Sequence, residues 1–323
     1  MKQSRARGTI VWSSGCAIAL VLGILMGSKN HVPFMGQVET WSIGIYEGPS
    51  AFDLHGSSNV VNPVLTARDV TDIDAAFVAD PFVLVDDAIY HMFFEVWNSA
   101  TGQGDIALAT SADGFHWEYE QVVIDEPFHL SYPYVFRWED DIFLIPESEQ
   151  DRSVRLYKAV SFPREWELQT TLLWGYHFTD PSIFRHDDRW WLFTSFTESD
   201  VLRLYHADRL GGPWAEHPSS PIVREDPNIA RPGGRILQMD GRTFRLTQDD
   251  YPTYGNQLRA FEITELTPTT YAETPASPDP ILRGSGLGWN ERGMHHADHH
   301  VIDGRWVVYV DGTTIETVFG WKH

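Results

Sequence analysis

The sequence predicts an all-β protein, a five-bladed β-propeller of four-stranded antiparallel blades, preceded by an N-terminal transmembrane helix. The propeller is predicted by turn pairs that recur about every fifty residues, each between two runs rich in aromatic and branched residues. The helix is predicted by an uncharged run near the start of the chain. The turn pairs are Asp87-Ala88, Glu139-Asp140, Asp187-Asp188, Asp240-Gly241 and Asp303-Gly304.

Four of the five repeats continue with two further strand-like runs, which gives four strands per repeat. The third runs begin at Ile106, Val154, Leu202 and Leu258, and an aromatic residue follows each: Trp117, Trp166, Trp214 and Tyr271. The fourth runs are Gln121–Ile124, Thr170–Leu173, Ile222–Arg224 and Ile281–Arg283. Four antiparallel strands repeated radially form a propeller, and long amphipathic helices are absent from the sequence.

The fifth repeat shows only two clear strands at the C-terminal end. The stretch from Trp41 to Pro49 resembles the third-strand pattern, and Pro63–Ala67 resembles the fourth. We therefore expect the N-terminal segment to complete the last blade and close the ring. Sequential closure by Thr314–Trp321 is the alternative.

The first residues predict a membrane segment. Lys2, Arg5 and Arg7 precede a run without charge from Gly8 to Gly27, and about 20 apolar residues span a bilayer. The basic flank predicts that the N-terminus stays inside. The expected organisation is a signal anchor over 1–27, a linker over 28–40 and the propeller over 41–323. Such a protein is single-pass, with the propeller on the extracytoplasmic side; a cleaved signal peptide, the alternative, makes it secreted.

Charge and composition exclude several function classes. The net charge of −21 argues against nucleic acid and against broad contact with anionic lipid. An acidic chain with 13 tryptophans and 12 tyrosines suits a neutral polyhydroxylated ligand, although acidity for solubility alone is the alternative. The single cysteine, Cys16, lies in the apolar run, so the folded body has no disulfide, thiol nucleophile or thiolate metal site.

Polar residues occupy positions that a propeller brings to its axis. Seven residues before each turn pair lie Asp80, Tyr132, Asp180, Gly233 and His296, and eight residues after its first member lie Glu95, Glu147, Ser195, Gln248 and Asp311. We expect these positions to face each other across each hairpin and to gather on one face of the propeller. Buried polar groups need partners, so the sequence predicts a ligand pocket in a central funnel; a self-satisfied, water-filled polar ring is the alternative.

Several motifs resemble known carbohydrate-active propellers. Phe77-Val-Ala-Asp-Pro-Phe, Phe178-Thr-Asp-Pro-Ser-Ile-Phe and the Ala-x-Ser-x-Asp-Gly-x-x-Trp stretch ending at Trp117 resemble five-bladed glycoside hydrolases of family 43. A closer resemblance, over about residues 40–315, is to the N-terminal propeller domain of glucosamine inositolphosphorylceramide transferases and to stand-alone bacterial relatives. The segments that carry it are Ser131-Tyr-Pro-Tyr-Val-Phe, Ile145-Pro-Glu-Ser, Arg231-Pro-Gly-Gly-Arg and Tyr254-Gly.

The hydrolase resemblance implies roles for three acidic residues. Asp80 matches the general base and Asp180 matches the aspartate that orients the acid. Arg231 stands where those hydrolases place the glutamate acid, and a guanidinium cannot deliver a proton near neutral pH. Glu147 on the same face is the best substitute, because Tyr132 opposite it would raise its pKa by partial desolvation. Either another residue has taken the acid role or hydrolysis has been lost.

Further side chains are predicted to bind substrate or metal. Arginines recognise carboxylate and phosphate, which suggests an anionic sugar or phosphorylated lipid glycan, although pairing with the funnel acids is the alternative. The predicted substrate-binding residues are Tyr132, Arg231, Arg235, Arg245, Gln248, Tyr254 and Asp311. His296 matches the fifth-blade histidine that approaches an axial metal or water in related propellers, so it is the predicted ligand of an axial divalent ion such as Ca²⁺. By strand alternation, His296, Asp298 and His300 share one face, and His295 and His299 the other.

These features together predict an exported, membrane-tethered, glycoside hydrolase-like protein acting on a carbohydrate or glycolipid. It would contact the membrane through residues 8–27 and would not bind nucleic acid. A non-catalytic glycan-binding or glycosyltransferase-accessory propeller is the alternative, and a purely structural interaction propeller is a third. Four tryptophans stack either on sugar rings or, as wedges, between blades: Trp190, Trp191, Trp289 and Trp306.

Overall fold

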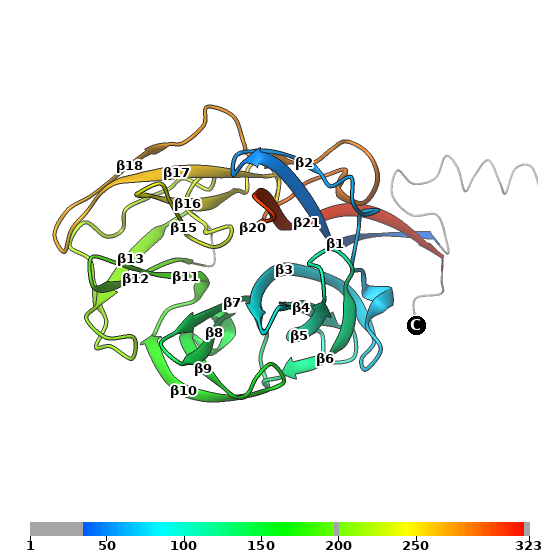
Figure 1. Ribbon diagram of the computed structural model, residues 1–323, viewed down its shortest axis with the longest axis horizontal. Coiled ribbons are helices and arrows are strands. Elements are labelled where there is room, and N and C mark those ends of the chain that lie inside the picture. The colour runs from blue at the N-terminus through cyan, green and yellow to red at the C-terminus, as the bar shows by residue number, and fades with distance from the viewer. Residues whose placement is uncertain (1–34, 197–199, 320–323) are drawn as a thin grey trace, which may run out of the picture. The chain divides into compact units, whose positions relative to one another are not determined.

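The computed structural model describes residues 35–196 and 200–319, and the five predicted sheets are present within this part of the chain. The chain divides into two compact units. The larger, Thr40–Thr314, contains the five blades, which are arranged around a common axis (Figure 1). The smaller contributes the described residues 35–39 and 315–319, the start of β1 and the end of β21. No helix among the described residues is long and apolar enough to cross a membrane. The predicted segment over residues 8–27 lies outside them.

Each of the first three blades runs from an inner to an outer strand. Blade 1 contains β3 (Ala75–Asp86), β4 (Ile89–Asn98), β5 (Gln103–Ser111) and β6 (Glu118–Ile124). Blade 2 contains β7 (Ser131–Trp138), β8 (Asp141–Ser148), β9 (Ser153–Ser161) and β10 (Glu165–Trp174). Blade 3 contains β11 (Phe178–His186), β12 (Arg189–Phe196), β13 (Leu202–Ala207) and the short β14 (Ala215–Glu216). The fourth run predicted here, Ile222–Arg224, forms only a single bridge, between Val223 and Leu202.

The last two blades contain the remaining strands. Blade 4 contains β15 (Leu237–Met239), β16 (Arg242–Asp249) and β17 (Gln257–Leu266), whose outer edge pairs with both β18 (Tyr271–Pro275) and β19 (Leu282–Arg283). Blade 5 has the order β2 (Asp53–Gly56), β1 (Met35–Ser50), β21 (Arg305–Phe319), β20 (Ala297–Ile302). Within the described ranges, three short 3-10 turns lie between strands: Ala67–Asp69, Glu149–Asp151 and Gly288–Asn290.

The predicted closure of the ring is confirmed, because the N-terminal strands β1 and β2 supply the outer half of blade 5. The predicted fourth strand of this blade was wrong. Pro63–Ala67 forms no strand, and Leu65 makes only an isolated bridge to Ile43, whereas Asp53–Gly56 pairs with β1. The Ala51-Phe52 turn between β1 and β2 is short, so the hairpin closes earlier than the sequence pattern suggested.

The blades are held together by apolar side chains between neighbouring sheets. The second strands of blades 1 and 2, β4 and β8, are buried on both faces, which explains their nearly continuous apolar runs. Trp190 of blade 3 lies 4.9 Å from the ring of Trp138 and 5.9 Å from that of Phe136, both in blade 2. Trp190 and Trp191 are therefore packed in the core, as expected for wedges rather than for sugar platforms.

Three inner strands share a bulge that shapes the funnel. Asp80, Tyr132 and Asp180 each precede a proline and have φ between 47° and 54°. Such a residue interrupts the pairing, so the residue before it takes the cross-strand position: Ala79 pairs with Glu95, Ser131 with Glu147 and Thr179 with Ser195. The predicted direct pairing of Asp80 with Glu95, and its equivalents in blades 2 and 3, is therefore wrong by one residue.

Candidate functional site

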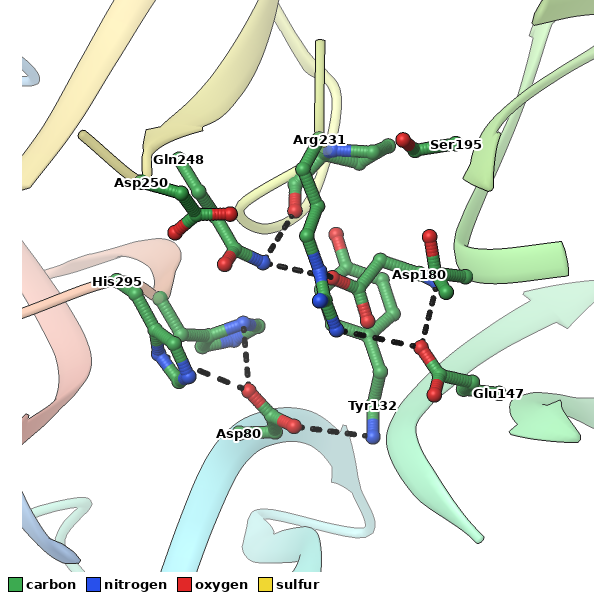
Figure 2. A network of polar contacts seen from close by, with 12 residues as sticks. Asp80, Tyr132, Glu147, Asp180, Ser195, Arg231, Gln248, Asp250 and His295 are labelled. Atoms are coloured by element: carbon green, nitrogen blue, oxygen red, sulfur yellow. Dashed lines mark hydrogen bonds and ion pairs between the residues drawn. The ribbon is translucent and has the colours of Figure 1, made fainter. Parts of the chain in front are cut away.

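The bulges aim backbone amides at carboxylates of the preceding blade. The N–H of Asp80 donates to Asp311 Oδ2 at 3.2 Å, and the N–H of Tyr132 donates to Asp80 Oδ2 at 3.2 Å. The N–H of Asp180 donates to Glu147 Oε2 at 3.0 Å. Figure 2 shows the resulting chain of contacts around the axis. Although the cross-strand partners shift, the predicted polar positions of blades 5, 1, 2 and 3 converge at the funnel.

Arg231 of blade 4 bridges two of the acids. Its Nε lies 2.5 Å from Asp180 Oδ2, and its terminal nitrogen lies 3.5 Å from Glu147 Oε2 (Figure 2). Gln248 donates to the same Asp180 oxygen at 2.6 Å. The Arg231 guanidinium also stacks over the ring of Tyr254, at 5.2 Å from its centre. All three charged side chains are nearly buried, so this is a desolvated charge network in which one cation serves two carboxyl groups.

A second charged group lies where blade 5 meets blade 1. His295 Nδ1 lies 2.8 Å from Asp311 Oδ2 and 4.0 Å from Asp80 Oδ1, and the imidazole stacks on the ring of Trp41 at 4.1 Å. Asp311 also accepts the backbone N–H groups of His295 and His296 through its other oxygen. Its carboxylate is therefore held from several sides, although none of it is exposed to solvent.

This group can hold a metal ion, but with a ligand other than the one predicted. One ligand atom each from Asp80, His295 and Asp311 lies within 4.8 Å of the others. The predicted ligand, His296, instead places Nε2 at 3.0 Å from the carbonyl oxygen of Pro81 and Nδ1 at 3.8 Å from Asp80. Two carboxylates and an imidazole are a mixed donor set, which differs from the all-oxygen shell that Ca²⁺ prefers. The donors do not identify an ion.

The predicted separation of the histidines onto two faces was wrong for His295. Strand β20 begins only at Ala297, so strand alternation does not extend to His295 and His296, and both approach Asp311 and Asp80. Within the strand the alternation holds, since His300 Nε2 lies 2.9 Å from Asp298 Oδ2.

Burial changes the protonation of the site. It raises the pKa of Asp80 to about 7, a rise that His295 opposes and Asp311 increases. Burial also raises the pKa of Glu147 and of Glu95 well above the usual range, and nearby carboxyl groups add to both shifts. For His295 burial lowers the pKa, but the facing Asp311 outweighs it and holds the value at about 9. Burial therefore favours the protonated forms of Glu147 and Glu95 relative to free glutamate, whereas Asp311 favours the cationic form of His295.

A cavity of about 160 Å³ opens between these groups. Its polar lining includes Asp80, Glu95, Glu147 and Arg231, and its aromatic lining includes Trp41, Phe77, Trp97 and Tyr254. Phe77 and Trp97 stack on each other at 5.5 Å on the blade 1 side, whereas Trp41 and Tyr254 pack against His295. Flat apolar rings beside carboxyl groups suit a ligand with both C–H faces and hydroxyls.

Comparison with known proteins identifies the family. Residues 36–313 match the family model described as "Glucosamine inositolphosphorylceramide transferase 1, N-terminal". The chain belongs to this family. It is 36 % identical over 301 residues to glucosamine inositolphosphorylceramide transferase 1 of Oryza sativa subsp. japonica and 33 % identical to that of Arabidopsis thaliana. Each alignment covers 85 % of this chain but only 40 % and 39 %, respectively, of the plant protein.

Solved structures share the fold of this transferase N-terminal family member at low identity. A glycosyl hydrolase from Bacteroides ovatus has a TM-score of 0.61 at 10 % identity and covers 80 % of this chain and 92 % of its own. The family 62 α-L-arabinofuranosidase domain of Coprinopsis cinerea has a TM-score of 0.57 at 13 % identity, with coverages of 85 % and 96 %. The exo-β-1,3-galactanase of Clostridium thermocellum has a TM-score of 0.56 at 14 % identity, and the match covers 75 % of this chain and 65 % of the galactanase. These likenesses confirm the predicted five-bladed fold.

Two of the arginines predicted to bind substrate lie away from the cavity in this transferase-family propeller. Arg235 pairs with Asp298 of blade 5 at 2.6 Å and donates to the carbonyl oxygens of Val135 in blade 2 and Val83 in blade 1, which ties blade 4 to three other blades. Arg245 makes a two-point contact with Glu273 at 2.5 and 2.6 Å within blade 4. Both guanidiniums form ion pairs within the protein, which agrees with the alternative that these arginines pair with acidic residues instead of binding substrate. The partner of Arg245, Glu273, is not one of the funnel acids.

Of the other residues predicted to bind substrate, Gln248 and Asp311 do not line the cavity but contact residues of the site, Asp180 and His295 respectively. Tyr132 also lies outside the cavity lining. The Tyr132 hydroxyl contacts Ser182 at 2.8 Å, and it accepts the N–H of Gly234 at 2.7 Å. Tyr132 therefore packs blades 2, 3 and 4 together instead of facing Glu147. Tyr254, the remaining predicted substrate-binding residue besides Arg231, lines the cavity.

Sequence reasoning missed several cavity residues: Trp41, Phe77, Trp97, His129 and His295. Trp97 lies two residues after Glu95, so alternation along β4 was a usable signal. His129 lies in the connection between blades 1 and 2, where no periodicity applies. Its Nδ1 accepts the N–H of Gly104 at 2.8 Å, and its Nε2 lies 3.8 Å from Glu95.

His129 gives the fold a specific sensitivity to acid. Burial lowers its pKa to about 4, and protonation would abolish the bond that Nδ1 accepts from Gly104. Because the folded-state pKa lies below the unfolded value of about 6.5, stability is full above pH 6.5 and is lost as the pH falls towards 4. We expect protonation of this histidine to lower the free energy of unfolding by about 3 kcal/mol between pH 6.5 and pH 4.

The measurement is the free energy of unfolding of the wild type and of His129→Asn at several pH values between 7 and 4. The asparagine oxygen can still accept the Gly104 amide but does not titrate. The difference between the two proteins should therefore grow in favour of the variant as the pH falls. Parallel curves over this range would contradict the assignment.

Proposed function

We propose that the funnel binds a glycan without hydrolysing it, as the accessory propeller of a glycosyltransferase system. The observation that carries this proposal is the ion pairing of Arg231 with both Asp180 and Glu147. In the hydrolase-like alternative Glu147 would have to give up a proton to a leaving group. Here its Oε2 is engaged by the Asp180 amide and lies near a guanidinium, and Asp180 is bound to Arg231 and Gln248.

The cavity supports a sugar as the ligand. Trp97 with Phe77 on one side and Tyr254 with Trp41 on another offer flat apolar surfaces, and Asp80 and Glu95 supply hydroxyl partners between them. The plant relatives carry the name glucosamine inositolphosphorylceramide transferase 1. We infer that the ligand is a monosaccharide of a glycolipid headgroup, and that transfer is carried out by another domain or protein. We further propose that residues 8–27 anchor the chain in a membrane, with the propeller on the extracytoplasmic side.

Hydrolysis by a different acid is the second candidate function, and Glu95 is the observation that favours it. Its carboxyl lines the cavity, burial raises its pKa well above the usual range, and it makes no hydrogen bond to the described residues. A protonated Glu95 beside Asp80, whose pKa is about 7, offers an acid and a base within one cavity.

Replacing Trp97 with alanine should weaken glycan binding about fivefold or more, because a stacked aromatic ring contributes about 1 kcal/mol or more to such contacts. Titration calorimetry of the full chain in detergent, with glycans selected on an array, measures the affinity. Trp138→Ala is the matched control, since Trp138 lies at the opposite end of its blade, and it should bind as the wild type does. Equal affinity of wild type and Trp97→Ala would refute the site.

The same glycans are then incubated with the wild type and with Glu95→Gln to test for turnover. Binding without product supports the accessory role. Product that disappears in Glu95→Gln supports the second candidate and overturns the first. Product that persists in this variant but disappears in Glu147→Gln would instead support the hydrolase mechanism predicted from the sequence.

A further inference from the structure

The strand order defines two faces of the propeller. In each blade the inner strand starts at the funnel and runs to the turn pair on the opposite face, as β3 runs from Asp80 to Asp86. The second-to-third strand loops and the connections between blades therefore lie on the funnel face. The turn pairs and the third-to-fourth strand loops lie on the opposite face.

The exposed large aromatic side chains lie on the funnel face alone, within the part of the chain that the structure describes. They are between 49 % and 65 % exposed: Trp174, Tyr176, Tyr251 and Tyr254. Trp174 and Tyr176 lie where blade 2 passes to blade 3, and Tyr251 and Tyr254 lie in the loop after β16. Leu287, 80 % exposed, lies in the connection into blade 5 on the same face. The large apolar residues exposed on the opposite face are aliphatic, among them Val160 and Val301.

The chain also enters the propeller on the funnel face. Trp41, near the start of the larger unit, lines the cavity. Trp41 lies 14 positions after Gly27, the end of the uncharged run, so the two lie at most about 50 Å apart. A bilayer that contains this run therefore lies within reach of the face that carries the exposed aromatics. Tryptophan and tyrosine are enriched where protein meets lipid headgroups, because their rings are apolar at one end and polar at the other.

We propose that the funnel face of the propeller docks on a lipid bilayer, with Trp174, Tyr176, Tyr251 and Leu287 as the contact residues. The bilayer surface is expected to consist of zwitterionic lipids, because a chain with a net charge of −21 is repelled by anionic headgroups. This inference extends the proposed function, since a funnel that faces the bilayer receives a glycolipid headgroup without extraction of the lipid.

Site-directed spin labelling of the full chain in phosphatidylcholine nanodiscs tests the docking. In a Cys16→Ala background, nitroxides are placed at Trp174→Cys and Tyr251→Cys, with Val160→Cys and Val301→Cys as controls of similar exposure on the opposite face. On transfer from detergent to nanodiscs, accessibility to an aqueous nickel chelate relative to oxygen should fall several-fold at 174 and 251 only. No change at 174 and 251, or an equal change at all four positions, would overturn the proposal.

Two further measurements distinguish membrane docking from a glycan-binding role of the same aromatics and from the proposed function of the cavity. If a soluble glycan protects positions 174 and 251 and the lipid does not, the aromatics form a glycan surface and the docking is refuted. Glycan affinity is measured on the same preparations. If the protein binds the glycan but positions 174 and 251 do not enter the bilayer, only the membrane docking is refuted. If these positions enter the bilayer but no glycan is bound, only the proposed function is refuted.

Discussion

Replacement of Arg231 with alanine is expected to lower the free energy of unfolding by about 3–5 kcal/mol. The side chain of Arg231 is 14 % exposed, and those of its partners Asp180 and Glu147 are 2 % and 7 % exposed. Removal of the cation leaves two carboxyl groups without compensation in a region from which water is largely excluded, and this cost exceeds the direct value of the pair. Urea denaturation at neutral pH measures the change.

An ion pair on the surface of the same blade provides the control. Arg242 makes a two-point contact with Glu262, but its side chain is 55 % exposed, so Arg242→Ala should leave the denaturation midpoint almost unchanged. The double variant Arg231→Ala with Asp180→Asn should recover part of the loss, because one uncompensated charge is removed. If Arg231→Ala and Arg242→Ala are equally stable, the buried network does not hold the funnel together.

The second large effect is expected at Gly234, where blade 4 meets blade 5. Its φ of 144° is one that side-chain-bearing residues rarely adopt, and a Cβ would lie 2.0 Å from the carbonyl oxygen of Ala297. Its amide also donates to the Tyr132 hydroxyl at 2.7 Å. Gly234→Ala should cost more than about 4 kcal/mol, because both the backbone conformation and the contact between blades must change.

Thermal unfolding and soluble yield measure this effect against Gly241→Ala. Gly241 also has a positive φ, of 71°, but a Cβ at this position would have no heavy atom within 4 Å, so only the conformational cost of about 1 kcal/mol is expected there. Should Gly234→Ala fail to fold, Tyr132→Phe tests the same junction more gently and should cost about 1–3 kcal/mol. Equal stability of Gly234→Ala and Gly241→Ala would show that the junction is not tightly packed.

The number of blades and their closure could be predicted because turn pairs and alternating runs are local signals that repeat. The direct partners of the polar residues could not, because one residue with a positive φ before proline moves the pairing by one place. Asp80, which precedes Pro81, forms such a bulge inside β3. The polar positions still converge on the funnel, because a bulge changes which residues pair but not the end of the blade at which they lie.

The candidate site was harder to predict, because its chemistry depends on contacts between blades. Arg231, Arg235 and Arg245 look alike in sequence, yet only Arg231 lines the cavity, whereas Arg245 is held by Glu273 within its own blade. His295 could not be preferred over His296 without knowing that β20 begins at Ala297. Trp41 precedes its neighbour His295 by more than 250 residues, and only ring closure brings the two together.

The composition of blade 5 means that both ends of the chain determine the integrity of one sheet. Among the strands of the described residues, its outer two come first along the chain and its inner two come last, so during synthesis β1 and β2 lack their partners β21 and β20 until these emerge. Deletion of β1 and β2, or of β20 and β21, would therefore damage the same blade, together with the Trp41 and Asp311 sides of the cavity. Fusion tags attached after residue 319 and those attached before residue 35 are accordingly expected to disturb one common region.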